Sequence, residues 1–560
     1  MDFAWDRLPE SLPEALLEGL CGGGAGKLHL LRLARLCLDS GVDAGPDGGA
    51  DASRLRPLGL DLLSAAFEAD PLDPELAGQF LALAPDARSG PLGAALGALH
   101  SQAQTTAATE KCEQLARRGG AQRAREAITA ALREDPGNPR LLRLALDLAW
   151  QGGCAGWAAG LLEAPWSDGA EPLRSFALGN ALFLHGDFER AHEAYAAAAV
   201  LPFPTISWRL GECLLRLGQR EQALRTWRQC LGARPWNANL LLRTHDVAGG
   251  LDTARRPLDG PLAVLLYTWN KAGLLDATLT ALFASELSGA RVFVLNNGST
   301  DATATVLSAW RERVGPERLE RIDLPVNVGA PAARNWLASL PGVKACRYAA
   351  YLDDDALLPP DWLGRLGAAV AAYPRAGVYG CKVVDAANPT RIQNADLHIR
   401  PGSGAEPKTE QPGNGLALSD LHLLEPDYGQ FDYLRPCVSV TGCCHLFRTR
   451  VLAEAGGFDI ALSPSQFDDL EHDLRLNLKG LPAAYQGHLR VGHARRTGEQ
   501  GKTSPRAAAN AFGNLAKIER SHSRRDIRDI ARQDQARLVQ DLRNKAAALG
   551  VDAGQATRTA

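Results

Sequence analysis

The sequence predicts two kinds of fold in one chain, an all-helical part followed by an α/β part built on a parallel sheet. Three observations support this prediction. Residues 118–248 contain a repeat with the length of a helical hairpin. From residue 258 onward, short apolar runs alternate with helical patterns. The 560 residues are 46% hydrophobic and 22% charged, as is typical of globular proteins, and this length corresponds to roughly three domains.

The first 117 residues are predicted to form a helical N-terminal region. They are rich in Ala and Leu, and apolar residues recur at helical spacing in residues 28–38 and 58–67. Gly and Asp dominate residues 41–53, which we expect to form a loop.

Residues 118–250 are predicted to form helical repeats. The pair Leu178-Gly179 recurs as Leu210-Gly211, and the same offset aligns Tyr195 with Trp227. Small residues thus fall where two helices approach closely, and large residues fall where the gap between the helices must be filled. The pattern resembles the tetratricopeptide repeat, in which helix–turn–helix units of ~34 residues stack into a solenoid. A generic helical bundle is the alternative.

Residues 258–504 are predicted to form the α/β domain. Apolar runs at 262–267, 291–295 and 349–352 are candidate buried strands, and a helical pattern lies between each strand and the next. Such alternation indicates a parallel sheet with helices on its faces, and ligands of such sheets bind at the carboxyl ends of the strands. Residues 505–560 are expected to return to helix as a C-terminal extension.

Charge and cysteine content narrow the classes of function. The chain has 61 basic and 64 acidic residues, a net charge of -3, which argues against a general nucleic-acid binder. No apolar run approaches the ~20 residues that a transmembrane helix needs, and the N-terminus lacks the apolar core of a secretory signal. The 11 cysteines are scattered without a CxxC pair, which favours buried thiols over disulfides or a zinc module. We expect a cytoplasmic protein, which could act peripherally at the inner face of the membrane.

Three consecutive acids follow the third predicted strand. Asp353, Asp354 and Asp355 lie at its carboxyl end. Carboxylates so close repel one another unless they share a cation. Hard oxygen ligands of this kind suit Mg²⁺ or Mn²⁺, with phosphate oxygens completing the coordination.

A second acidic cluster begins a predicted helix at Asp468. Asp468, Asp469 and Glu471 lie in the first turn of that helix, where its dipole favours negative charge. A purely structural interpretation is also possible, with the acids capping the helix and Arg475 serving as an ion-pair partner.

Residues 262–495 resemble a family 2 glycosyltransferase of the GT-A fold. The motifs that carry the resemblance occur in the family's order: Thr268-Trp269-Asn270, Asn297-Gly298-Ser299-Thr300-Asp301, Asn327-Val328-Gly329 with Ala333-Arg334-Asn335, Asp353-Asp354-Asp355, Gly456-Gly457-Phe458-Asp459, Asp468-Asp469 with Glu471 and Arg475, and Val491-Gly492-His493. The chain is thus expected to combine a Rossmann-like nucleotide-diphospho-sugar transferase domain with a preceding all-helical solenoid.

The resemblance implies roles for individual residues. It places Tyr267 and Thr268 beside the nucleotide of a sugar donor, and Asn297 in the position that contacts the base. It places Arg334 near the donor phosphates or ribose and Asp354 near the ribose, and it counts Asp353 among the donor-binding residues. The residues implied as metal ligands are Asp353, Asp355 and His493, and those implied in catalysis are Asp469, as the base, and Asp468.

These roles together imply an inverting, metal-dependent transfer from a nucleotide-sugar to an acceptor hydroxyl. The acceptor is expected near residues 437–475, on a protein docked on the helical repeats or on a bacterial surface glycan. The alternative is a repeat scaffold with an inactive transferase domain. Trp269, Trp336 and Trp362 are candidate sugar-stacking side chains, although for each of them packing in the core is the favoured interpretation.

Overall fold

The computed structural model describes most of the chain. The described residues are 5, 12–39, 48–84, 88–102, 105–164, 166, 169–287, 289–400, 414–419, 421–423, 425–494 and 505–550, with the side chains of 48–54 and 505–508 left out. They divide into two compact units. Unit 1 takes residues from Met1–Ala248, Leu423–Gln430 and Ala546–Ala560, and unit 2 takes Gly249–His422 and Phe431–Lys545.

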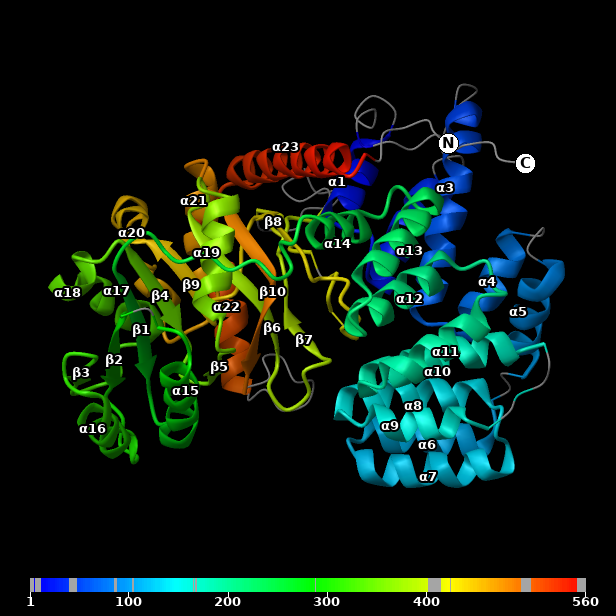
Figure 1. Ribbon diagram of the computed structural model, residues 1–560, viewed down its shortest axis with the longest axis horizontal. Helices are drawn as coiled ribbons and strands as arrows, with labels where there is room; N and C mark the ends of the chain where they lie inside the picture. The colour runs from blue at the N-terminus through cyan, green and yellow to red at the C-terminus, as the bar shows by residue number, and fades with distance from the viewer. Residues whose placement is uncertain are drawn as a thin grey trace. The chain divides into compact units, whose positions relative to one another are not determined.

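Unit 1 is built from helices α1 to α14 (Figure 1). Their bounds are α1 Glu14–Gly22, α2 Lys27–Asp39, α3 Gly48–Ala69, α4 Pro74–Leu83, α5 Gly90–Gln102, α6 Ala107–Arg117, α7 Ala121–Glu134, α8 Pro139–Gly152, α9 Ala155–Leu162, α10 Glu171–His185, α11 Phe188–Ala198, α12 Pro204–Arg216, α13 Arg220–Ala233 and α14 Ala238–Ala248. The predicted loop at 41–53 is corrected in its second half, because α3 already begins at Gly48. Residues 41–47 lie outside the described residues.

The repeated residues form the contacts that their pattern predicts. A Cβ atom on Gly179 in α10 would lie 2.6 Å from the Tyr195 ring in α11. A Cβ atom on Gly211 in α12 would likewise lie 2.2 Å from the Trp227 ring in α13. Each glycine therefore lets the second helix of its hairpin bring a large aromatic ring against the backbone of the first.

A buried ion-pair network joins the N-terminal helices to the repeats within unit 1. Arg234, which follows α13 and is 2% exposed, donates to Glu68 of α3 at 2.5 Å and to Asp61 at 2.9 Å. Two parallel hydrogen bonds between a guanidinium and a carboxylate fix the orientation of both groups. The pair of Arg234 and Glu68 therefore fixes the end of α13 against α3.

Unit 1 also contains the segment 423–430, which lies far along the sequence from its helices. The Arg209 guanidinium of α12 lies 3.7 Å from the centre of the Tyr428 ring. The Tyr428 ring also packs against Phe183 of α10, with centroids 5.7 Å apart. Asn239 of α14 donates to the backbone oxygen of Gln430 at 2.8 Å. These contacts make the segment a part of the helical unit.

Unit 2 contains a mixed sheet with the strand order β3-β2-β1-β4-β9-β6-β10-β5, flanked by β7 on β6 and β8 on β10 (Figure 1). The strands are β1 Leu262–Thr268, β2 Arg291–Asn297, β3 Leu319–Leu324, β4 Tyr348–Leu352, β5 Ala356–Leu357, β6 Val378–Asp385, β7 Ile392–Asn394, β8 Leu434–Cys437, β9 Cys444–Arg448 and β10 Ala483–His493. The three predicted strands are β1, β2 and β4. The prediction of a parallel sheet holds for β3-β2-β1-β4 and for β6-β10, whereas β4-β9, β6-β9, β6-β7, β8-β10 and β5-β10 are antiparallel.

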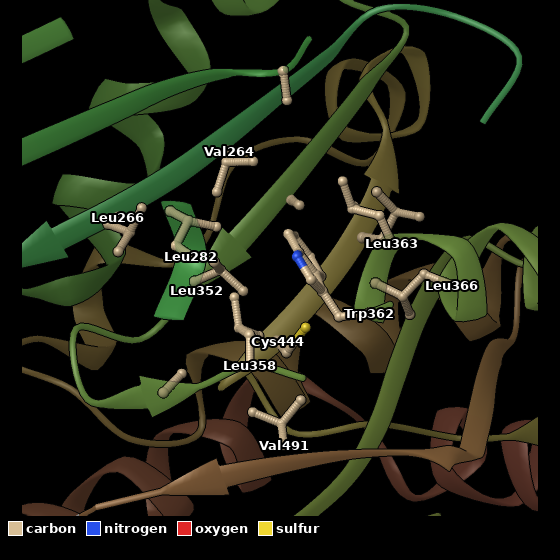
Figure 2. Close-up of a cluster of buried hydrophobic side chains, with 14 of the residues drawn as sticks. Val264, Leu266, Leu282, Leu352, Leu358, Trp362, Leu363, Leu366, Cys444 and Val491 are labelled. Atoms are coloured by element: carbon tan, nitrogen blue, oxygen red, sulfur yellow. The ribbon is translucent and has the colours of Figure 1, made fainter. Parts of the chain in front are cut away.

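Helices cover this sheet. They are α15 Ala272–Ala284, α16 Thr303–Val314, α17 Ala330–Ser339, α18 Pro341–Lys344, α19 Trp362–Ala372, α20 Thr449–Ala455, α21 Asp468–Leu478, α22 Pro505–Ser521 and α23 Arg524–Ala548, with a 3-10 turn at Ile460–Leu462. The main core lies between sheet and helices. Figure 2 shows Trp362 there among Leu282 of α15, Leu352 of β4 and Cys444 of β9.

Candidate active site

The candidate site lies where β1, β2 and β4 end side by side. β1 pairs in parallel with both β2 and β4, so the three carboxyl ends meet at one edge of the sheet. Thr268 ends β1, Asn297 ends β2, and Asp353 directly follows β4. All three are residues that the sequence predicts as donor-binding, and the strand topology brings them to one edge.

Asn297 is fully engaged in holding the loop after β3. Its Nδ2 donates to Asn327 Oδ1 at 2.9 Å, and its Oδ1 accepts from the backbone N–H of Val328 at 2.9 Å. Asn297 is 2% exposed. The Asn297 amide therefore holds residues 327–328 in place. This loop lies beside the position that the resemblance assigns to the base.

The three consecutive acids are neutralised by different cations. Lys271 donates to Asp354 at 2.5 Å and to Asp355 at 3.0 Å. The Nε2 atom of His493 lies 3.0 Å from Asp355 Oδ1 and 3.7 Å from Asp353 Oδ2. These cations separate charges that would otherwise repel one another.

The pKa values of the acids differ with these surroundings. Burial raises the pKa of Asp353 to about 6, against the opposing effect of His493 and Arg334. Burial also acts to raise the pKa of Asp355, but its contacts with His493 and Lys271 lower it to about 2. Burial favours neutral His493, yet the neighbouring Asp355 raises the pKa of that imidazole above its ordinary value.

Among the described residues, a group that could hold a metal ion consists of Asp353, Cys443 and His493. One ligand atom of each lies within 4.8 Å of the other two. Asp355 adjoins the group through His493, so the predicted ligands Asp353, Asp355 and His493 do come together. The oxygen and imidazole donors fit a divalent cation.

The second acidic cluster lies at the start of α21, and its two aspartates differ. Asp468 is 3% exposed and its Oδ2 accepts from Arg334 Nη1 at 2.9 Å. Asp469 is more exposed, and its Oδ2 accepts from the backbone N–H of Gly442 at 2.7 Å. Arg475 pairs with Glu471 at 2.9 Å, as the structural interpretation of the cluster predicts. Its capping part is wrong, because the N-cap residue of α21 is Phe467 and no side-chain cap hydrogen bond forms there.

Arg334 connects the two acidic clusters. This buried side chain reaches Asp468 at 2.9 Å and Asp353 at 3.8 Å. Its guanidinium also lies over the Tyr267 ring, 5.5 Å from the ring centre. A Cβ atom on Gly442 would lie 2.6 Å from Arg334 Nη2, so a larger residue there would displace the end of the guanidinium.

Residues 263–456 match the sequence model of a family described as glycosyl transferase family 2. The resemblance to family 2 glycosyltransferases is thus confirmed for this part of the chain. None of the curated proteins matches the sequence. Among the described residues, no helix is long and apolar enough to cross a membrane.

Several solved structures are similar to the chain at low identity. GalNAc-T7 with UDP, GalNAc and Mn²⁺ is 13% identical over 52% of this chain and 55% of that chain, with a TM-score of 0.36. The mannosyltransferase PcManGT from Pyrobaculum calidifontis, in complex with GDP-Man and Mn²⁺, is 17% identical over 59% of this chain and 88% of that chain, with a TM-score of 0.35. TarS 1–349 of S. aureus is 14% identical over 52% of this chain and 75% of that chain, with a TM-score of 0.31. The chain thus spans about half the length of the first of these structures.

The transferase domain also contains site residues that the sequence analysis missed. Lys271 lies shortly after the first predicted strand, but the sequence alone does not show its ion pairs with Asp354 and Asp355. These pairs form because β1 and β4 lie side by side in parallel. Cys443 was interpreted as a buried thiol, and no local signal linked it to Asp353 or His493. Gln393, which contacts His493, lies in the short strand β7 and carried no motif.

The three candidate stacking tryptophans separate into two groups. Trp362 is 0% exposed in the core and donates to Ser285 Oγ at 3.0 Å, so the core interpretation is confirmed for it. Trp269 and Trp336 are 51% and 47% exposed, so the core interpretation is wrong for them. Trp269 follows β1 directly and lies at the same edge of the sheet as the site.

Proposed function

We propose that the transferase domain moves a sugar from a nucleotide-sugar donor to an acceptor hydroxyl with inversion at the anomeric carbon. The observation that carries the proposal is the meeting of two acidic clusters, more than a hundred residues apart in sequence, on the single side chain of Arg334. One cluster offers metal and donor ligands, and the other offers Asp469 as a base for the acceptor.

The residues on the donor side bind and orient the leaving group. Asp353, Asp355 and His493 would hold Mn²⁺ or Mg²⁺, which when bound supplies positive charge against the diphosphate. Tyr267, Thr268, Asn297 and Asp354 would contact the nucleoside. Arg334 faces the charge that develops as the bond between the anomeric carbon and the phosphate oxygen breaks, with the electron pair leaving on the diphosphate.

Asp469 acts on the acceptor. Its carboxylate takes the proton of the acceptor hydroxyl as the hydroxyl oxygen bonds to the anomeric carbon. The Gly442 N–H at 2.7 Å fixes the orientation of this carboxylate. Because attack comes from the face opposite the leaving diphosphate, the configuration inverts and no covalent sugar–enzyme intermediate forms.

The proposed acceptor hydroxyl lies on a protein or on a surface glycan. A family 2 domain on a chain with helical repeats supports a protein acceptor, because stacked helical hairpins offer extended binding surfaces. In unit 1 the surface around Arg209 and Phe183 already binds the chain's own segment 423–430. A docked protein would therefore use another face of the repeats or displace this segment.

Thermal unfolding of the full chain with a panel of nucleoside diphosphates, with and without Mn²⁺, tests the donor side of the proposal. A diphosphate at a hundred times its Kd stabilises the folded state by roughly 2.7 kcal/mol, so its binding raises the Tm. We expect one diphosphate to raise the Tm when Mn²⁺ is present. Asp355→Asn should abolish this shift, while the matched control Asp529→Asn, on the surface of α23, should keep it. If no diphosphate shifts the Tm in any metal, the proposed transfer is wrong and the scaffold alternative gains support.

A further inference from the structure

Cys443 lies beside the predicted metal ligands because of strand pairing. β4 and β9 are antiparallel with Leu352 opposite Cys444, so the next pair along is Asp353 and Cys443. The backbone N–H of Asp353 donates to the carbonyl oxygen of Cys443 at 3.0 Å, which continues this register beyond the strand. Side chains of directly paired residues lie on the same face of a sheet. The thiol and the Asp353 carboxylate therefore point to the same side.

The neighbouring thiol of Cys444 points elsewhere. Successive residues of a strand face opposite sides. Both cysteines belong to the main core, where Cys444 lies near Trp362 (Figure 2). Both cysteines are almost completely buried, at 2% and 0% exposure. The Cys443 sulfur, in contrast, lies within 4.8 Å of ligand atoms of Asp353 and His493.

His493 is held in the orientation of a metal ligand. Its Nδ1 atom lies 2.8 Å from Gln393 Oε1, and because that oxygen can only accept, Nδ1 carries the hydrogen. Gln393 Nε2 donates to the backbone oxygen of His493 at 3.2 Å, which fixes the direction of the amide. Nε2 of His493 then faces the carboxylates, and it offers a lone pair to a metal ion once its proton has left. Metal-bound histidines are held by second hydrogen bonds of this kind.

A second buried carboxylate lies directly beside this imidazole. Asp355 is 1% exposed, and its Oδ1 atom has no hydrogen-bond partner among the described residues. His493 Nε2 lies only 3.0 Å away. A carboxylate oxygen and an imidazole lone pair at this distance repel one another unless a proton or a metal ion lies at the imidazole nitrogen.

We propose that Cys443 is a ligand of the divalent metal ion, together with Asp353 and His493, and that its thiolate shifts the preference of the site toward Co²⁺ and Zn²⁺ and away from Mg²⁺. This inference rests on the metal site of the proposed function. The sulfur binds as the thiolate, so one proton leaves the thiol for solvent when the metal–sulfur bond forms. Thiolate ligands favour the softer metals, whereas Mg²⁺ requires oxygen ligands in an octahedral arrangement.

Co²⁺ titration of the full chain, followed by absorption spectroscopy, tests the ligand directly. The wild type should bind one equivalent of Co²⁺ and develop a sulfur-to-cobalt charge-transfer band in the near ultraviolet. Cys443→Ala should lose this band, and the matched control Cys444→Ala should keep it. In calorimetric titrations, Cys443→Ala should weaken Zn²⁺ binding by at least about tenfold, since even a lost supporting contact costs 10–100-fold, and should leave Mg²⁺ binding unchanged.

The outcomes separate the thiol ligand from the metal site itself. Wild-type protein that binds Co²⁺ with ligand-field bands but without the charge-transfer band would overturn the thiol ligand. Equal Zn²⁺ affinity in the wild type and in Cys443→Ala would do the same. Either result would leave a metal site made of oxygen and nitrogen ligands. No Co²⁺ binding by the wild type would overturn the metal site of the proposed function as well. If Cys443→Ala does not fold, the other two proteins still test the proposal. A charge-transfer band in both the wild type and Cys444→Ala supports a sulfur ligand other than Cys444, and no band in the wild type overturns it.

Discussion

Asp468 and Asp469 are adjacent in sequence but suited to different tasks. Asp468 is buried in an ion pair with Arg334, and burial and the charge of Asp469 raise its pKa against the effect of that arginine. Asp469 is partly exposed and is held by one backbone N–H. A base must reach the acceptor hydroxyl, so we propose Asp469 for that task and Asp468 as a positioning residue for Arg334.

Asp469→Asn should therefore lower kcat by about 10²–10⁴-fold, the usual contribution of a general base, because the amide cannot take up the acceptor proton. Binding of a nucleoside diphosphate with Mn²⁺, measured as a Tm shift, should stay unchanged. Asp468→Asn should instead destabilise the folded state by about 3–5 kcal/mol, since it leaves Arg334 buried with a lost partner. If Asp468→Asn is stable but inactive while Asp469→Asn stays active, the base is Asp468 and not Asp469.

Residues at strand ends could be predicted from sequence, and residues brought in by distant strands could not. Asp353 was found because an apolar run precedes it and parallel strands end at one edge. Cys443 and Gln393 reach the same site through the antiparallel pairs β4-β9 and β6-β7. Local periodicity does not encode which strands pair, so neither residue carried a signal.

At the scale of elements, the C-terminal helices support α21. Residues 505–548 were predicted as helix, and the structure divides them into α22 and α23. Asn514 of α22 is 0% exposed and donates to the backbone oxygens of Leu462 and Ser465 at 2.7 and 2.9 Å. These oxygens lie in the loop that precedes Asp468 and Asp469. The C-terminal extension thus holds the entry to the helix that carries the proposed base.

α23 is anchored by a buried histidine between two carboxylates. His398 contacts Asp534 of α23 and Asp396, each at 2.9 Å. Arg435 and Tyr433 also face Asp396, at 3.7 and 3.1 Å. Burial disfavours the imidazolium, but Asp534 and Asp396 raise the pKa of His398 above its ordinary value. Asp396 stays ionised, because its contacts with His398 and Arg435 lower its pKa despite burial.

We expect the free energy of unfolding to fall as the pH rises above the ordinary histidine pKa of ~6.5. The raised pKa of His398 means that its stabilising charge is present below the ordinary histidine pKa of ~6.5 and is lost as the pH rises through the folded-state value. His398→Ala should reduce this pH dependence and cost about 3–5 kcal/mol, because it leaves buried carboxylates without a partner. Urea unfolding across this pH range measures both effects, and His192→Ala in α11 is the control. A wild-type stability that is flat or rising with pH would contradict the anchor.

Strands with a polar face were harder to predict than buried ones. β1, β2 and β4 were found because nearly every residue is buried, which produces a continuous apolar run. β3 was missed because four of its six residues, from Glu320 to Asp323, are polar or partly exposed at the sheet edge. Beyond β4 the parallel prediction holds for β6 and β10 but not for β8 and β9, which pair antiparallel with β10 and β4.

At the scale of the whole chain, the boundary between helical and α/β parts is not a single point in the sequence. The segment 423–430 lies between β7 and β8 in sequence, yet it packs in unit 1. No local pattern predicts this placement, because Tyr428 forms its contacts with Arg209 and Phe183 more than two hundred residues away. Removing residues 1–250 would therefore also strip the segment of its partners, so point substitutions are the sharper probe of the helical unit.

Tyr428→Ala should lower the free energy of unfolding of the helical unit by about 3–5 kcal/mol, as for other large aromatic side chains removed from a core. Tyr428 is 7% exposed, and its ring fills the space between Arg209 and Phe183. Tyr428→Phe keeps the ring and should cost less than about 1.5 kcal/mol. Urea unfolding followed by intrinsic fluorescence measures both changes. Binding of a nucleoside diphosphate with Mn²⁺ should be the same in both variants, because the proposed donor residues all lie in unit 2. Equal unfolding midpoints for Tyr428→Ala and Tyr428→Phe would show that the segment is not part of the helical core.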